Sequence, residues 1–248
     1  MFSDAKRHLL YRIGNVPLRP YPYAHFYLDR VFPDSLYAEM RRRLPSSDAY
    51  TSLADTGRVT KGAYRERTVL FFDDRSLGAM TSDSAAFWGG IRELLLDRDV
   101  MELLIAKFDG PIQRRFAHTN ANVEVEPEAY LVRDRTNYAI GPHTDAPHRL
   151  VSALFYIPAD DRWRAHGTSL YVPKDGRFTC EGGPHYAPAP FERMATMEFM
   201  PNTLFAFAKT DNSFHGVEPV TDAGIERDVI LYAIRLKNRV ASPIGEAA

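Results

Sequence analysis

Apolar and polar residues recur with a helical period in much of the first half of the chain. Apolar residues line one face of residues 33–44, and Pro33 and Asp34 suit the first turn of a helix, so we expect a helix there. A second helical pattern covers residues 84–108, and Gly110-Pro111 is expected to end it. The first half is therefore predicted to be largely helical.

The segments around these helices carry different signals. Three prolines between positions 17 and 22 predict an extended lead-in over residues 1–30, with a short strand at 23–28. The polar stretch 46–67 is predicted to be a loop, and residues 68–72 are predicted to form a strand.

The second half of the chain has the alternation and turn residues of short strands. Strands are predicted at residues 122–125, 129–134, 149–157, 169–172, 194–198, 203–208 and 227–236. Seven or eight short strands after a helical part predict a mainly β fold, a double-stranded β-helix or jelly roll, with an N-terminal helical layer. We expect residues 1–248 to form a single domain, with 1–118 as a mixed support region and 119–240 as the jelly-roll core.

Composition narrows the class of protein. The 248 residues carry a formal net charge of −1, which gives no electrostatic reason to expect nucleic acid or an anionic membrane as a partner. Cys180 is the only cysteine, so an intramolecular disulfide is excluded, and no apolar run approaches the roughly 20 residues of a membrane span. The start of the chain lacks a signal-peptide core, and we expect a cytoplasmic protein. The sequence does not address its oligomeric state.

The candidate chemistry centres on His143 and Asp145, which are separated by one residue. In an extended strand, residues i and i+2 point to the same face, so these two side chains can converge on one metal ion. A third ligand, His215, follows the strand-like run 202–208. Two histidines and one carboxylate form the facial triad of non-haem Fe(II) oxygenases, although the same three ligands would also suit a catalytic zinc ion.

Arg227 favours Fe(II) over Zn(II) as the metal of this site. It opens the last predicted strand, twelve residues after His215. A guanidinium group binds a carboxylate through two parallel hydrogen bonds, so Arg227 would suit a dicarboxylate co-substrate. A hydrolytic zinc site has no need for such a cation, and Fe(II) is therefore favoured.

The order and spacing of His143-x-Asp145, His215 and Arg227 resemble those of the 2-oxoglutarate/Fe(II)-dependent dioxygenases, in particular the prolyl-hydroxylase-like group. The resemblance covers residues 120–238, and residues 22–33 look like the entry segment of bacterial members. It implies Fe(II), 2-oxoglutarate and O2 as cofactor and co-substrates, with ascorbate as a candidate reductant. The implied reaction is hydroxylation of a C–H bond, with release of succinate and CO2.

The resemblance also implies roles for individual residues. His143, Asp145 and His215 match the catalytic metal ligands, Arg227 matches the cation that binds the distal carboxylate, and Tyr156 matches a tyrosine that contacts the same carboxylate. Plant-type members carry Arg-x-Ser, whereas Asp228 and Val229 follow Arg227 here. Arg235, which shares strand parity with Arg227, is the alternative cation.

Several assignments stay open. The substrate is a small molecule or biosynthetic intermediate in one hypothesis and a peptidyl residue in a second, while a cupin-like metal-binding jelly roll without 2-oxoglutarate chemistry is the alternative from another class. Residues 46–67 form either an active-site lid or a surface loop. Other polar residues are expected near the site or outside it: Arg133 and Arg135 as pocket-lining cations or as a solvated strand edge, Asp211 or Asn212 as a support for His215, and His118, His166 and His185 as surface or core histidines without ligand-like spacing.

Overall fold

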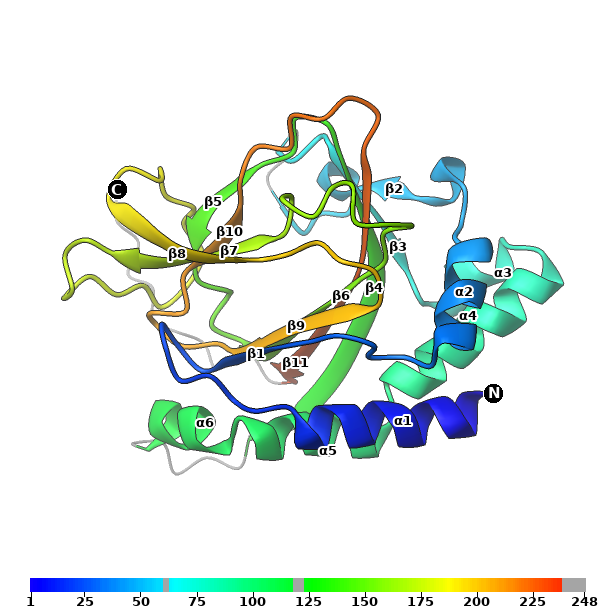
Figure 1. Cartoon of the computed structure of the whole chain (residues 1–248), viewed down its shortest axis with the longest axis horizontal. Coiled ribbons are helices and arrows are strands. Elements are labelled where there is room, and N and C mark those ends of the chain that lie inside the picture. Colours follow the sequence, from blue (N-terminus) through cyan, green and yellow to red (C-terminus); the bar gives the residue numbers. More distant parts are fainter. Residues whose placement is uncertain (60–62, 118–122, 238–248) are drawn as a thin grey trace.

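The computed structural model describes residues 1–59, 63–117 and 123–237, and it contains two antiparallel β-sheets that face each other (Figure 1). The larger sheet has the strand order β1 (His25–Leu28), β9 (Thr203–Ala208), β6 (Arg149–Tyr156), β11 (Glu226–Leu236), β4 (Val125–Arg135), β3 (Arg67–Phe71), β2 (Thr51–Ser52). The smaller sheet has the order β5 (Ile140–His143), β10 (His215–Val217), β7 (Thr168–Pro173), β8 (Phe191–Met197).

From β4 to β11 the chain crosses repeatedly between the two sheets. Strands β4, β6, β9 and β11 lie in the larger sheet, and β5, β7, β8 and β10 lie in the smaller one. Four strands in each sheet with this alternation form a jelly roll, so the predicted fold class is confirmed. Strands β1, β2 and β3, which precede residue 118, extend the larger sheet. The predicted internal boundary at 118/119 itself lies outside the described residues.

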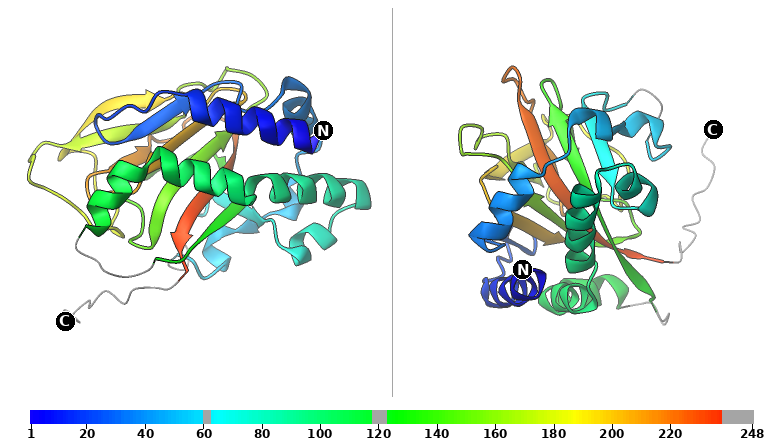
Figure 2. Two further views of the ribbon diagram at one scale, coloured as in Figure 1. Left: turned by 90° about the horizontal axis from the view of Figure 1, so that it is seen from below. Right: turned by 90° about the vertical axis from the view of Figure 1, so that its right-hand side faces the viewer.

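The helices cover the outer face of the larger sheet. They are α1 (Phe2–Asn15), α2 (Asp34–Arg42), α3 (Asp74–Gly78), α4 (Ser82–Leu95), α5 (Arg98–Lys107) and α6 (Asp109–Phe116), with short 3₁₀ turns at Ser47–Ala49 and Leu53–Asp55. Seen from below in Figure 2, α1 lies alongside α5 across the strands. None of the helices in the described part of the chain is long and apolar enough to cross a bilayer.

Strand parity separates two apolar layers on either side of the larger sheet. On β11, Ile230, Tyr232 and Ile234 pack with the helices in the main core. Val229 points the opposite way and joins an inner cluster with Tyr156, Leu170, Phe199, Phe205 and Phe207. Since alternate residues of a strand face opposite sides, Arg227 shares the inner face with Val229. The inner face therefore carries both the apolar lining and the polar groups of the candidate site.

The N-terminal part departs from the sequence prediction in two places. Residues 2–15 form helix α1, because Ala5, Leu9 and Ile13 recur on one face and are fully buried, while the prolines begin only after the helix ends. The extended lead-in was therefore wrong for residues 2–15. Pro111 does not end the helical region either, because it lies in the first turn of α6, where proline is tolerated.

Candidate metal centre

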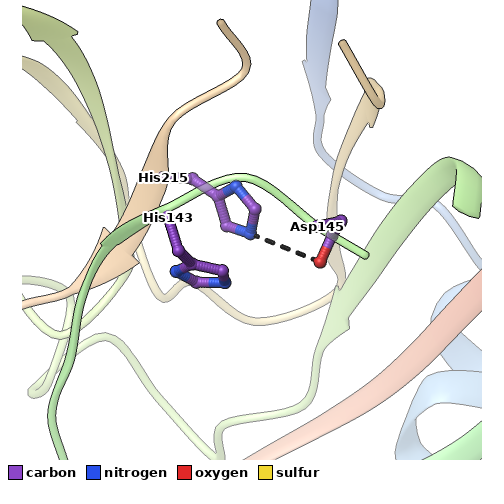
Figure 3. A group of neighbouring side chains, drawn as sticks. All are labelled: His143, Asp145 and His215. Carbon is purple, nitrogen blue, oxygen red and sulfur yellow. Dashed lines mark ion pairs between the residues drawn. The ribbon is translucent and has the colours of Figure 1, made fainter. Parts of the chain in front are cut away.

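The three predicted metal ligands come together at one edge of the smaller sheet. His143 ends β5 and His215 begins β10, and the two residues are direct partners in the antiparallel pairing of these strands. Their rings lie 4.2 Å apart between centroids, and Asp145 follows in the loop after β5 (Figure 3). One nitrogen of each histidine and one oxygen of Asp145 all lie within 4.8 Å of one another. A single cation can therefore be reached by all three side chains.

Hydrogen bonds to backbone carbonyl groups fix both imidazole rings. Nδ1 of His143 lies 2.9 Å from the carbonyl oxygen of Gly141, and Nδ1 of His215 lies 3.0 Å from that of Ser213. A carbonyl oxygen only accepts, so each Nδ1 carries the proton and each Nε2 keeps a free lone pair. Ser213 supports His215 in this way. Asp211 and Asn212, the two candidates for that role, instead pair through their side chains with Lys209 and Thr210.

Burial and neighbouring charges set protonation states that suit metal binding. Burial lowers the pKa of His143, and His215 beside it lowers that pKa further. Burial also lowers the pKa of His215. For Asp145, burial acts to raise the pKa, but Arg149 and the two histidines outweigh it and hold the pKa well below its usual range. At neutral pH the centre therefore offers two neutral imidazoles and one carboxylate.

A glycine allows the two ligand strands to approach each other. A Cβ atom at Gly216, next to His215, would lie 2.5 Å from the carbonyl oxygen of Ile140 on β5. A side chain at this position would force β10 away from β5 and would separate the two histidines. The close approach needed for a common metal ion is thus encoded in a residue that is not a ligand.

Ser152 orients the third ligand. Its hydroxyl group, on the inner face of β6, donates a hydrogen bond to Oδ2 of Asp145, while Arg149 lies 3.7 Å from Oδ1. We expect Ser152→Ala to weaken Fe(II) affinity by about 10-fold to 100-fold, the usual cost of removing a partner of a metal ligand. Anaerobic equilibrium dialysis with Fe(II) checks this. Unchanged affinity would show that Arg149 alone suffices to orient Asp145.

Arg227 and Tyr156 lie together on the inner face of the larger sheet. Arg227 is only 1% exposed, and its Nε donates to the carbonyl oxygen of His166 at 2.7 Å. The Tyr156 hydroxyl donates to Oγ1 of Thr168 at 2.7 Å, and Nη2 of Arg227 lies 3.5 Å from that same oxygen. Two residues that lie far apart in the sequence thus meet at one point, together with Thr168.

Arg227 also belongs to a buried ionic network. Nη1 of Arg227 donates to Oδ2 of Asp134 at 2.8 Å, and Arg67 holds the same carboxylate through bonds of 2.6 and 2.9 Å. Two guanidinium groups and one carboxylate leave an excess of one positive charge. An unbalanced charge is costly in a buried environment, so this network suits one further carboxylate.

The inner apolar layer connects this network to the metal centre. The ring centroids of Phe207 and His215 lie 4.5 Å apart, and Phe207 belongs to the same apolar cluster as Tyr156. The guanidinium carbon of Arg227 lies 5.5 Å from the centre of the Tyr156 ring. The metal centre and the cationic network therefore border one continuous inner layer.

Two of the expected cations lie elsewhere. Arg133 forms a bidentate pair with Asp228 on the opposite face of the larger sheet from Asp134, so it does not line the pocket. Arg135 is exposed, in agreement with the alternative of a solvated strand edge. Val229 stands where the Arg-x-Ser pattern has its serine, and it shares the inner face with Arg227, so no hydroxyl group is present at that position. The alternative cation, Arg235, pairs with Glu126 at 3.0 Å.

A histidine without ligand-like spacing lies beside the metal centre. The ring of His185, in the segment between β7 and β8, lies 4.5 Å from that of His143 and forms a hydrogen bond with the hydroxyl group of Tyr64. Tyr64 belongs to the stretch 46–67, so one residue of that stretch reaches the neighbourhood of the centre. His166 instead bonds Asp222, and His118 lies outside the described residues.

No protein-family model and no curated protein sequence matches the chain. A prolyl-4-hydroxylase from Pseudomonas putida is similar in structure, with 16% identity, 96% of this chain and 100% of that chain covered, and a TM-score of 0.49. A prolyl hydroxylase from Trichoplax adhaerens, in complex with a hypoxia inducible factor peptide fragment, has 12% identity, coverages of 94% and 90%, and a TM-score of 0.48. HygX from Streptomyces hygroscopicus, with nickel, 2-oxoglutarate and hygromycin B bound, has 11% identity, coverages of 92% and 86%, and a TM-score of 0.46. At such identities, and with TM-scores below 0.5, these similarities assign no function.

Proposed function

We propose that the protein is a 2-oxoglutarate- and Fe(II)-dependent dioxygenase, which hydroxylates a C–H bond of a small molecule or biosynthetic intermediate with release of succinate and CO2. The observation that carries the proposal is the combination of two sites along one inner layer. One is the cluster of His143, Asp145 and His215, and the other is the buried cationic network around Arg227. We further propose that residues 1–248 act as one catalytic domain.

The donor set fits Fe(II). His143 and His215 would bind the ion through Nε2, and Asp145 would bind through a carboxylate oxygen. Three such ligands would occupy one side of the ion and would leave positions open for other molecules. When bound, Fe(II) with 2-oxoglutarate and O2 supplies the oxidising chemistry, and the protein supplies orientation and a site from which water is excluded.

The cationic network fits the distal carboxylate of 2-oxoglutarate. Arg227 would bind this carboxylate through Nη2, and Tyr156 and Thr168 would contribute their hydroxyl groups. Asp134 holds Arg227 in place and leaves the pair with Arg67 one positive charge in excess, which the incoming carboxylate neutralises. Charge-assisted hydrogen bonds in such a buried site are among the strong ones.

Two alternatives make different demands. A peptidyl hydroxylase would use the same metal and co-substrate and would differ only in the substrate. A cupin-like metal-binding jelly roll would have no use for a buried cation in excess on the inner face, and the network around Arg227 therefore favours the dioxygenase. We also propose that the stretch 46–67 provides a lid for the site, because Tyr64 of this stretch bonds His185, whose ring contacts that of His143.

The deciding experiment is an anaerobic titration of the Fe(II)-loaded protein with 2-oxoglutarate. We expect a weak visible charge-transfer band that saturates at one equivalent, followed by succinate formation when air is admitted. The same titration with Zn(II)-loaded protein, which has no such band, is the control. A protein that holds Fe(II) but shows neither the band nor succinate would favour the cupin-like alternative.

A further inference from the structure

Tyr23 has a buried hydroxyl group without a hydrogen-bond partner in the part of the chain that the structure describes. The residue lies just before β1 and is only 3% exposed. Its ring packs against Phe207 of the neighbouring strand β9, with 5.8 Å between the ring centres. A buried hydroxyl group without a partner has lost its hydrogen bonds to water and has gained none from the protein. The binding of a ligand that offers an acceptor to this hydroxyl group would therefore be favoured.

The position of Tyr23 indicates what that partner is. Tyr23 belongs to the inner cluster that contains Tyr156, and the Phe207 ring on which it packs also contacts the ring of His215. Tyr23 therefore lies in the inner layer that both the metal centre and the cationic network border. Burial raises the pKa of Tyr23 well above its usual value, and the charge of Asp145 and the nearby Tyr156 raise it further. The hydroxyl group thus stays protonated and can act as a donor.

We propose that the hydroxyl group of Tyr23 donates a hydrogen bond to an oxygen atom of 2-oxoglutarate bound between the metal ligands and Arg227. This inference rests on the proposed function and adds a co-substrate-binding residue from the N-terminal segment. The oxygen-rich co-substrate supplies the acceptor that the described protein groups do not. The segment before β1 would thereby form one wall of the co-substrate site and would not merely cap the sheet.

The chain offers a matched control in Tyr232. Its hydroxyl group is also buried and without a partner among the described residues, but Tyr232 belongs to the core on the helix side of the larger sheet. Tyr23→Phe and Tyr232→Phe each remove one oxygen atom from a buried tyrosine and leave the ring in place. A general effect of losing a buried hydroxyl group would appear in both variants, whereas a contact with the co-substrate would appear only in the first.

The experiment measures two quantities for the wild-type protein and both variants. The first is the Kd of 2-oxoglutarate for the Mn(II)-loaded protein by calorimetry, and the second is the melting temperature with and without saturating 2-oxoglutarate. We expect Tyr23→Phe to raise the Kd about tenfold or more, since the acceptor is charged. Without 2-oxoglutarate its melting temperature should equal or exceed that of the wild type, because no bond is lost. Tyr232→Phe should match the wild-type Kd, and Mn(II) affinity should stay unchanged in both variants.

The two proposals fail in different ways. If the wild-type protein binds 2-oxoglutarate and Tyr23→Phe binds it equally well, Tyr23 does not contact the co-substrate and the proposed function is unaffected. If Tyr232→Phe weakens binding as much as Tyr23→Phe, the effect is a general one and the contact is again refuted. If the wild-type protein binds Mn(II) but not 2-oxoglutarate, the proposed function fails and the role of Tyr23 fails with it.

Discussion

Replacing His143 with alanine should lower the affinity for Fe(II) by more than about 100-fold and abolish succinate formation. Removing a residue that only supports a ligand already costs about 10-fold to 100-fold in affinity, and the loss of a ligand itself should cost more. The reason is the small number of ligands: with His143 removed, two of the three residues of the described cluster, Asp145 and His215, remain to hold the ion. Iron bound per protein after anaerobic dialysis, and Mn(II) titration as a second probe, measure the effect.

The control for this variant is another buried histidine. His166 is 8% exposed, as is His143, but its ring bonds Asp222 away from the metal centre. We expect His166→Ala to keep its full content of iron. An equal loss of iron in both variants would indicate a general loss of structure. Full iron content in the His143→Ala protein would rule out the three-residue centre, and His185, whose ring contacts His143, would be the next ligand to test.

The convergence of the metal ligands could be predicted in part from one local rule and one resemblance. The i, i+2 spacing of His143 and Asp145 brings the two side chains to one site. The resemblance supported His215 as the third ligand, but its direct pairing with His143 across two strands joins residues far apart in the chain and was not predicted. The strands themselves, β5 and β10, were not predicted, because four and three residues are too few to establish an alternation.

The choice of inner and outer face could not be predicted. Parity shows that Arg133 and Arg135 share one face, but it does not say which face looks inward. The pairing of Asp134 with Arg227 decides this, and it places Arg133 outside with Asp228. A shift of the register by one residue would exchange the two sets. The register between distant strands cannot be predicted from a single sequence. The face of the sheet on which Arg133 and Arg135 lie could therefore not be predicted either.

Some of the site residues that sequence analysis missed, such as Asp134 and Ser152, lie in regular strands, and others lie outside them. Tyr23 precedes β1, and Tyr64 and His185 come from irregular segments that meet across 121 positions of sequence. Strand parity makes no statement about such residues, and a single tyrosine or histidine has no recognisable pattern. The signal that identifies Tyr23 is energetic, a buried hydroxyl group without a partner, and it exists only once the fold is known.

Arg227→Gln should weaken 2-oxoglutarate binding by about 100-fold or more, since it removes the excess positive charge and the charge-assisted bonds of a buried site. Metal binding should be unaffected. Removing one partner of a buried ion pair commonly costs about 3–5 kcal/mol, but here Arg67 still holds Asp134 through two bonds, so we expect a loss of stability at the lower end of that range. Calorimetric titration of the Mn(II)-loaded protein and chemical denaturation measure the two effects.

A shortened co-substrate separates a contact with Arg227 from a merely structural role. 2-Oxobutyrate retains the carboxylate and keto oxygen that a metal would bind but lacks the distal carboxylate. The wild-type protein should bind 2-oxoglutarate far more tightly than 2-oxobutyrate, and Arg227→Gln should bind the two with similar, weak affinity. Arg235→Gln changes another cation of β11, which pairs with Glu126 of β4. This variant should keep the wild-type preference for 2-oxoglutarate over 2-oxobutyrate. If Arg227→Gln weakened both ligands equally, Arg227 would support the site without touching the distal carboxylate, and if it weakened neither, the assignment of 2-oxoglutarate to this network would be wrong.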